Sequence, residues 1–267
     1  MLGGTRYVVR VPGKDTSLLG IDRVAERDAN QRAAELGVAP PVAAMLEDPQ
    51  CLVTEFIEGR EMGSEELREP EVMARVAAAL RKVHDSPGAV PTSFDSFRVV
   101  EEYADTASQR GVEVPAAYSD AHRQAAEIEA VLTGPEHDPV PCHNDLLAAN
   151  FLDDGEQIWI VDWEYAGMGN RYFDLANFAI NNELSKEQHL ELLEGYFGEP
   201  PSDAQYAAMR LMMFMSDFRE AMWGVVQSGV SDLDVDFDEY ATKHFERMRE
   251  TAAEASFEQH LGEARDG

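Results

Sequence analysis

Four side chains in one short segment have the types and the order that phosphoryl transfer requires. They are His143, Asp145, Asn150 and Asp162, within PCHNDLLAANFLDDGEQIWIVDWEYAGMGNRYFDLANFAINN at residues 141–182. In such chemistry a carboxylate orients the attacking hydroxyl, while an Asn and another Asp hold the Mg²⁺ that neutralises the β- and γ-phosphates. We therefore predict a small-molecule kinase, with Asp145 as the catalytic base and Asn150 and Asp162 as metal ligands.

A predicted hairpin would bring these side chains together. Residues 150–162 contain two apolar runs joined by Asp-Asp-Gly, which is a strong turn signal. Asp145 then lies on the loop that enters the hairpin, Asn150 starts its first strand and Asp162 ends its second. We expect the three side chains to converge on one point.

Each residue also has a plain structural interpretation. His143 is predicted to be a scaffold residue whose imidazole bonds the loop backbone, rather than a proton-transfer group. Asp145 alone is compatible with a turn former, and Asn150 or Asp162 alone would be ordinary. An HxDxxxxN spacing followed by an apolar hairpin that ends in Asp is hard to assemble by accident, which favours the functional interpretation.

The remaining pattern is a small strand-bearing portion ahead of a larger helical one. Residues 5–13 alternate and are rich in β-branched side chains, which predicts a strand, and residues 51–59 predict another. Apolar residues at helical spacing predict a helix over residues 22–36 that Gly37 ends. Further helices are predicted over residues 70–84, 118–132, 186–197, 203–227 and 237–257.

Composition and charge limit the class of protein. The 267 residues, 44% of them hydrophobic, are enough for one sizeable core or two small ones. A net charge of −29 should repel nucleic acid and anionic membranes. It either concentrates a cationic substrate or reflects adaptation to a salty cytoplasm. No apolar run approaches the roughly 20 residues that cross a bilayer, and the N-terminus lacks signal-peptide features, so we expect a cytoplasmic protein without membrane insertion.

The two cysteines fit that compartment. Cys51 and Cys142 are far apart in sequence, with no CxxC spacing and no His/Cys cluster of the kind that zinc needs. Both are predicted to be buried thiols in a reducing environment.

The motif segment resembles the choline/ethanolamine kinase family, and less closely the aminoglycoside phosphotransferases. HNDLLAAN followed by IVDWEYAGMGNRYFDLANF carries the resemblance. Two C-terminal features add to it, Trp-x-x-x-Gln at residues 223–227 and Phe-Asp-Glu-Tyr-Ala at residues 237–241. The likeness covers most of residues 5–250.

The resemblance implies an α+β, protein-kinase-like fold of two lobes, with ATP and Mg²⁺ as cofactors. Residues 1–58 would form a reduced N-terminal β lobe, and residues 59–267 a larger, mostly helical C-terminal lobe. ATP would lie between the lobes. Asp174 resembles the buried aspartate that braces the catalytic loop in this family.

The resemblance also assigns residues to the nucleotide. Arg10 matches the strand position that grips the α- and β-phosphates, and Glu26 would pair with it from the following helix. The backbone near Glu55, Phe56 and Ile57 would receive adenine. An exposed strand arginine is the alternative interpretation of Arg10.

The family's substrate pocket is an aromatic box with an acidic element. Tyr165, Trp223 and Tyr240 match its aromatic positions, with Phe237 as a further candidate. A quaternary ammonium has no N–H donor, so ring faces hold it by cation–π attraction. Glu220 stands where choline kinases often carry a second tryptophan. Because a carboxylate accepts hydrogen bonds from a primary ammonium, Glu220 keeps ethanolamine in contention with choline.

The N-terminus departs from the family pattern. The family places two strands and a loop over the phosphates before the Arg-bearing strand, whereas only residues 1–4 precede Thr5 here. Either the start is misassigned or truncated, or this short form binds ATP poorly. Loss of this phosphate lid would remove backbone N–H donors and slow phosphoryl transfer.

Three functions remain open from the sequence. The first is an ATP- and Mg²⁺-dependent kinase of a small cationic alcohol, choline or ethanolamine by resemblance. The second is an aminoglycoside, sugar or thiamine kinase of the same superfamily. The third is a non-catalytic nucleotide- or ligand-binding homologue, which the missing lid favours and the intact set of Asp145, Asn150 and Asp162 disfavours.

Overall fold

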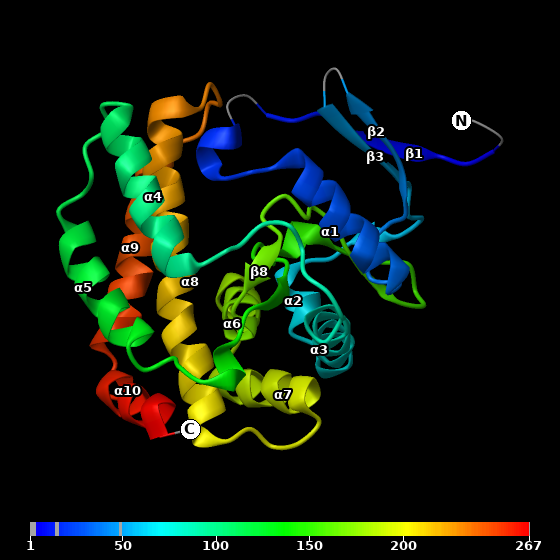
Figure 1. The fold of residues 1–267 in the computed structure, drawn as a ribbon. Helices are drawn as coiled ribbons and strands as arrows, with labels where there is room; N and C mark the ends of the chain where they lie inside the picture. Colours follow the sequence, from blue (N-terminus) through cyan, green and yellow to red (C-terminus); the bar gives the residue numbers. More distant parts are fainter. Residues whose placement is uncertain (1–3, 14–15, 48–49, 267) are drawn as a thin grey trace. The chain divides into compact units, whose positions relative to one another are not determined.

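The structure is a computed structural model that describes residues 4–13, 16–47 and 50–266 (Figure 1). Two compact units divide the chain: Met1–Phe94 with Pro139–Pro200, and Asp95–Asp138 with Pro201–Gly267. This division differs from the lobe boundary predicted at residues 58 and 59. That boundary stays a prediction.

The first unit begins with an antiparallel sheet in the order β1-β3-β2. Its strands are β1 (Tyr7–Arg10), β2 (Val42–Glu47) and β3 (Gln50–Glu55). Both predicted strands are therefore confirmed, and β2 is additional. In the register between β1 and β3, Tyr7 lies opposite Glu55 and Arg10 opposite Leu52. This register fixes where the Arg10 side chain leaves the sheet.

Helix α1 (Arg23–Glu35) packs on β2 and β3. It begins where predicted, because the Asp22 carboxylate accepts hydrogen bonds from the N–H groups of Val24 and Ala25 at 2.8 and 3.0 Å. It ends where predicted, because Gly37 adopts a left-handed φ of 70°. Ala25, Ala29 and Ala33 form the buried face.

The predicted hairpin is present as β6 (Phe151–Asp153) and β7 (Ile158–Ile160). Its turn is held by the Asp154 carboxylate, which accepts hydrogen bonds from two backbone N–H groups at 2.8 Å. The strands are shorter than predicted. Asn150 ends a 3-10 turn before β6 rather than starting the strand. Asp162 lies beyond β7 with a left-handed φ of 66°, which turns its side chain out of the hairpin.

Short strands attach the hairpin to its surroundings. One sheet has the order β4-β6-β7, and a separate ladder joins β5 to β8. The bounds are β4 (Arg60–Glu61), β5 (Val140–Cys142) and β8 (Gly167–Gly169). The loop that carries His143 and Asp145 follows β5 directly, so the β5–β8 ladder fixes the entry to that loop.

Four more α-helices belong to the described part of the first unit. They are α2 (Ser64–Leu67), α3 (Pro70–His84), α6 (Arg171–Asn181) and α7 (Lys186–Phe197). The bounds of α3 and α7 match the prediction, and these two helices pack on each other. Helix α6 was not predicted. Its apolar residues do recur at helical spacing, but the opposite face carries Asp174 and Asn177, which are buried, so its polar residues do not mark a solvent-exposed face.

In the part of the second unit that the structure describes, five α-helices are present besides a short 3-10 turn at Pro135–His137. They are α4 (Ser96–Gln109), α5 (Ala117–Glu129), α8 (Asp203–Val230), α9 (Phe237–Ala253) and α10 (Phe257–Asp266). Helix α8 forms the core, and α4, α9 and α10 pack along it (Figure 1). The single helix predicted over residues 237–257 is wrong. The chain breaks after Ala253, where Glu254 turns to an extended conformation, and α10 follows.

A glycine allows α8 and α9 to approach closely. A Cβ atom on Gly224 would lie 3.0 Å from Cδ1 of Tyr240 and 3.2 Å from the backbone nitrogen of Ala241. A larger residue would push the two helices apart. The approach brings Trp223 beside Tyr240, two residues that the sequence assigns to the substrate pocket.

Two further expectations concern the whole chain. No helix within the described residues is both long and apolar enough to cross a membrane. Cys51 and Cys142 are both buried free thiols, as predicted.

The acidic charge predicts that salt stabilises the fold. With a net charge of −29, carboxylate repulsion should oppose the compact state. Raising KCl from about 0.1 M to about 1 M shortens the Debye length from roughly 10 Å to roughly 3 Å, so we expect the melting temperature to rise. Differential scanning fluorimetry would measure it, with sucrose as the uncharged control. A melting temperature that is constant or falls with KCl would contradict the expectation.

Candidate active site

The loop between β5 and the 3-10 turn before β6 is held by the carboxylate of Asp174, in the first turn of α6. This carboxylate is fully buried and accepts hydrogen bonds from the backbone N–H groups of His143 and Asn144, at 2.8 and 2.7 Å. Asn144 has a left-handed φ of 66°, a conformation that non-glycine residues rarely adopt without support. The geometry is that of the brace that the sequence assigned to Asp174.

His84 completes the support of this carboxylate from α3. Its Nε2 lies 3.0 Å from Asp174 Oδ2, and its Nδ1 lies 2.7 Å from the Tyr196 hydroxyl. Burial alone would raise the pKa of Asp174. The hydrogen bond with His84 and the loop N–H group of His143 outweigh burial and hold the pKa below its ordinary value. Asp174 is therefore ionised at neutral pH.

His143 bonds the backbone on both sides of its ring, as predicted. Its Nε2 donates to the Val161 carbonyl at 2.9 Å, and its Nδ1 accepts from the Asp145 N–H at 3.2 Å. The edge-on ring of Trp163 lies 4.7 Å away between centroids. Burial lowers the pKa of His143, so the imidazole is neutral. These contacts are those of a scaffold residue.

Asp145 and Asn150 lie against each other. The amide Nδ2 of Asn150 donates to the Asp145 carbonyl at 2.7 Å and lies 3.4 Å from its carboxylate Oδ2. The Asn150 carbonyl accepts from the Val161 N–H at 2.9 Å, next to Asp162. The loop, the hairpin and Asp162 are thus joined through adjacent backbone groups.

Arg10 lies at the centre of an ionic cluster. Its Nη2 is 2.7 Å from Asp162 Oδ1 and 2.7 Å from Glu164 Oε2, and its Nη1 pairs with Glu26, as predicted. Arg23 joins from the start of α1, with Nη1 2.7 Å from Glu26 Oε2 and 3.2 Å from Glu164 Oε2. We call these five residues the Arg10 cluster. The exposed-strand alternative for Arg10 is excluded by these contacts.

Glu164 and Arg23 were not predicted from the sequence. Glu164 follows Asp162 by two residues, so in an extended chain both side chains can lie on one side. Arg23 precedes Glu26 by three residues on α1, a spacing that places both on one helix face. These two spacings were the only signals in the sequence. Neither shows that Glu164 pairs with Arg10 and Arg23, which lie far from it in the chain.

Electrostatics make this end of the site suited to a cation. Burial raises the pKa of Asp162, and the charge of Arg10 offsets this only partly. Burial and the charge of Asp162 likewise raise the pKa of Glu164. Asp162 Oδ1 is buried and, apart from the Arg10 ion pair, accepts no hydrogen bond from the residues that the structure describes. Together with the amide oxygen of Asn150, this all-oxygen donor set fits Mg²⁺.

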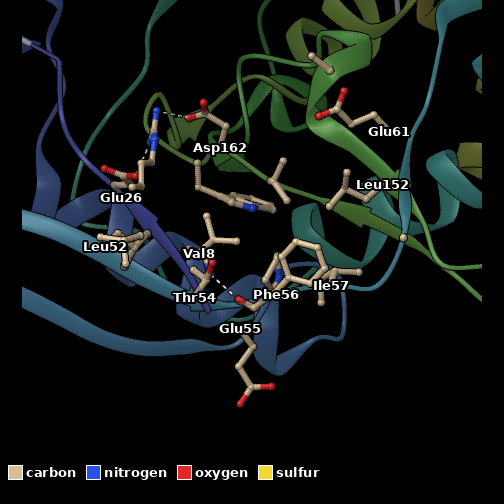
Figure 2. A pocket seen from close by; sticks show the side chains of 18 residues that line it. Val8, Glu26, Leu52, Thr54, Glu55, Phe56, Ile57, Glu61, Leu152 and Asp162 are labelled. Carbon is tan, nitrogen blue, oxygen red and sulfur yellow. Dashed lines mark hydrogen bonds and ion pairs between the residues drawn. The ribbon is translucent and has the colours of Figure 1, made fainter. Parts of the chain in front are cut away.

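A cavity of about 540 Å³ opens onto the cluster (Figure 2). Arg10, Glu26 and Asp162 line its polar end. Its walls are mainly apolar and include Val8, Leu52, Phe56, Ile57, Leu152 and Trp163. An apolar slot that leads to a charged end suits a ligand with a flat base and a phosphate tail.

The chain after β3 forms one edge of the cavity. The Glu55 N–H donates to the Pro41 carbonyl at 2.9 Å, and the Phe56 N–H to the Arg6 carbonyl at 3.0 Å. The Glu55 side chain points away from the cavity (Figure 2). The Ile57 N–H makes no hydrogen bond within the described residues, so it can serve a ligand.

The second unit groups four of the residues assigned to the substrate pocket. Ring centroids of Trp223 lie 5.4 Å from those of Tyr240 and 5.8 Å from those of Phe237. The Tyr240 hydroxyl donates to Glu220 Oε2 at 2.7 Å. Tyr165 belongs to the first unit, where its carbonyl accepts from Asn144 Nδ2 at 3.0 Å. Its membership of the pocket stays a prediction.

Glu220 is more enclosed than its predicted role requires. Its side chain is only 3% exposed, with one oxygen paired to Arg219 and the other bonded to Tyr240. Burial would raise the pKa of Glu220, but Arg219 and Tyr240 lower it below its ordinary value. The carboxylate is ionised and already engaged, so its geometry is that of a support for Tyr240.

The fold also brings together His84, Cys142 and Asp174, whose potential ligand atoms lie within 4.8 Å of one another. Both His84 nitrogens are engaged in hydrogen bonds. Burial raises the pKa of Cys142 well above its ordinary value, so the group is a thiol rather than the thiolate that a metal binds. The cluster acts as packing behind the loop.

Comparison with known proteins agrees with this geometry. A family model described as choline/ethanolamine kinase matches residues 3–194. The chain is 27% identical over 266 residues to ethanolamine kinase 2 of Rattus norvegicus, covering 89% of this chain and 68% of that protein.

Solved structures show the same fold. A choline/ethanolamine kinase family protein from Mesorhizobium loti has a TM-score of 0.87 and 32% identity, over 98% of this chain and 87% of that one. The aminoglycoside phosphotransferase APH(2'')-Ib has a TM-score of 0.59 and 16% identity, over 93% of this chain and 87% of that one. The predicted α+β, protein-kinase-like fold is confirmed.

The brace at Asp174 generates a stability prediction. Asp174→Asn should lower the free energy of unfolding at neutral pH by about 3 kcal/mol, because an amide N–H₂ would face loop N–H donors. A depressed folded-state pKa stabilises above the unfolded value of about 3.9 and is lost as pH falls through the folded pKa. The difference between wild type and variant should therefore shrink below about pH 4.

Urea unfolding across this pH range measures both effects. Asp138→Asn, at an exposed position before β5, is the matched control and should leave stability unchanged. A pH-independent difference, or none at neutral pH, would contradict the ionised brace.

Proposed function

This chain belongs to the choline/ethanolamine kinase family, and we propose that it transfers the γ-phosphoryl group of ATP to the hydroxyl of choline or ethanolamine. The observation that supports this most directly is the placement of Asp145 against Asn150, with Val161 joining both to Asp162 and the Arg10 cluster. Orientation and charge neutralisation are the main demands of phosphoryl transfer, and this arrangement supplies both.

Asp145 is proposed to accept a hydrogen bond from the substrate hydroxyl and to orient its oxygen toward the γ-phosphorus. Asn150 and Asp162 would hold Mg²⁺. When bound, this ion neutralises the β- and γ-phosphates. Support for the role of Asp145 comes from its position on a loop that Asp174 and His143 fix from behind.

The cavity of about 540 Å³ is proposed to receive the nucleotide. Adenine would lie between the apolar walls, with its edge toward the Glu55 carbonyl and the Ile57 N–H. Phe56 would contribute a ring to the wall. Arg10 would then bind the α- and β-phosphates, with Glu26 as its partner. The cytoplasm, where ATP is available and thiols stay reduced, is the proposed compartment.

The cationic end of the alcohol is proposed to lie against Trp223, Tyr240 and Phe237, with Tyr165 as a fourth ring. Edge-to-face packing among the first three fixes their orientation. Glu220 would hold Tyr240 in place through its hydroxyl, while Arg219 balances the charge of Glu220. A ring-lined site accepts trimethylammonium and primary ammonium groups, so both choline and ethanolamine fit.

Release of ADP from ATP and Mg²⁺, in the presence of high KCl, tests the activity. We expect turnover with choline or ethanolamine, and little with an aminoglycoside, a sugar or thiamine. Asp145→Asn should lower kcat by about 10²–10⁴-fold while leaving melting temperature and ADP affinity nearly unchanged. Asp120→Asn, an exposed aspartate on α5, is the control and should behave as wild type.

Preference for another alcohol in the panel would replace the proposed substrate. Folded protein that releases no ADP with any of them would favour the binding-module alternative. Near-normal turnover by Asp145→Asn would remove Asp145 from its assigned role.

A second prediction concerns the ammonium site. Trp223→Ala should raise KM for choline by roughly 3- to 30-fold, because one good cation–π contact is lost, and should leave KM for ATP nearly unchanged. Trp159→Ala is the control, since Trp159 lies on the hairpin and bonds Asp154. Equal changes in both KM values would place Trp223 outside the pocket.

A further inference from the structure

Arg23 is a buried cation in the Arg10 cluster to which the proposed mechanism gives no role. Its side chain is 9% exposed and bridges two carboxylates from separate segments, Glu26 on α1 and Glu164 beyond the hairpin. Its Nε is buried and has no hydrogen-bond partner among the described residues. Within the described residues, the Arg23 guanidinium therefore forms its ion pairs with these two glutamates.

The two arginines of the cluster share their partners unequally. Within the described residues, Arg10 contacts the carboxylates of Glu26, Asp162 and Glu164, whereas Arg23 contacts those of Glu26 and Glu164. Both arginines reach the same Glu164 oxygen, Oε2. Glu26 pairs with both arginines, through Oε1 with Arg10 and through Oε2 with Arg23. Arg23 therefore duplicates two of the three ion pairs that Arg10 makes.

This duplication matters once a nucleotide arrives. If Arg10 binds phosphates and Asp162 binds a metal ion, the contacts from Arg10 to Asp162 and Glu164 must loosen. Glu26 is 2% exposed, and a buried carboxylate left without a cation is costly. If Arg23 keeps its contacts with both glutamates, neither loses its compensating charge when Arg10 turns to the phosphates.

We propose that Arg23 is a positioning residue for the nucleotide: it holds Glu26 and Glu164 so that Arg10 is free to bind the phosphates. The inference rests on the proposed function, because it assumes that Arg10 contacts a nucleotide. Without Arg23, the two glutamates would compete with the phosphates for Arg10. Nucleotide affinity would fall, while the binding of the alcohol would not change.

A purely structural role for Arg23 makes a different prediction. Helix α1 is already fixed by the Asp22 cap and by its alanine face on the sheet. If Arg23 served only to anchor the helix, its loss would affect stability and both substrates together. A selective loss of nucleotide binding separates the two roles.

The test compares Arg23→Gln and Arg23→Lys with the matched control Arg27→Gln. Arg27 lies one turn further along α1 and pairs only with Asp28, in a half-exposed contact. Isothermal titration calorimetry gives the affinity for ADP with and without Mg²⁺, and steady-state kinetics give kcat and both KM values.

For Arg23→Gln we expect a loss of Mg²⁺·ADP affinity of about tenfold or more and a similar rise in KM for ATP. KM for the alcohol should change by no more than about twofold, which is much less than the tenfold loss expected for the nucleotide. Arg23→Lys keeps the charge but lacks the guanidinium fork, so its affinity should be intermediate. Arg27→Gln should match wild type.

Unchanged Mg²⁺·ADP affinity in Arg23→Gln would overturn the proposal, as would equal losses for nucleotide and alcohol. If Arg23→Gln does not fold, Arg23→Lys decides by the same criterion, selective loss against equal or no loss. The titration needs no alcohol. If wild type turns over none of the alcohols, the proposed function fails, yet the ADP affinities still decide the role of Arg23.

Discussion

The crowding of carboxylates around Arg10 is the constraint on which the site depends. Asp162, Glu164 and Glu26 meet at one guanidinium, and burial raises the pKa of the first two. Carboxylates this close together are stable only if cationic side chains are held firmly beside them. The β1–β3 register positions Arg10, and the capped start of α1 positions Arg23 together with its partner Glu26. Sheet and helix thus assemble a site in which three carboxylates share two arginines. The excess of negative charge favours the binding of a further cation.

The loop that carries His143 and Asp145 depends on the opposite arrangement, in which one buried carboxylate accepts several hydrogen bonds. Asp174 takes the loop N–H groups and His84, and its pKa is lowered rather than raised. The two sets of carboxylates therefore differ: Asp174 is fixed in a hydrogen-bond network, whereas Asp162 pairs with Arg10 and is proposed to hold a metal ion. Val161 links the two sets, because its carbonyl accepts from His143 and its N–H donates to Asn150.

Much of this was predictable where the signal is local. The Asp22 cap and Gly37 gave the bounds of α1, and the motif gave the contact of Asp145 with Asn150. Helix α6 was not found although its apolar residues have helical spacing, because Asp174 and Asn177 on its polar face are buried. The break after Ala253 was not found because Ala and Glu are good helix formers, so residues 252–255 carry no local signal for a turn. The ion pair of Arg23 with Glu164 joins segments from opposite sides of the site, and spacing alone cannot reveal such a partner.

Binding of Mn²⁺ as a spectroscopic substitute for Mg²⁺ tests the central claim most directly. Electron paramagnetic resonance would follow free Mn²⁺ in the presence of ADP, for wild type and for Asp162→Asn. The account predicts that ADP strengthens Mn²⁺ binding to wild type, and that Asp162→Asn loses this gain while keeping its melting temperature. Equal, ADP-dependent binding of Mn²⁺ by both proteins would contradict the assignment of Asp162 and the Arg10 cluster as the metal and nucleotide site.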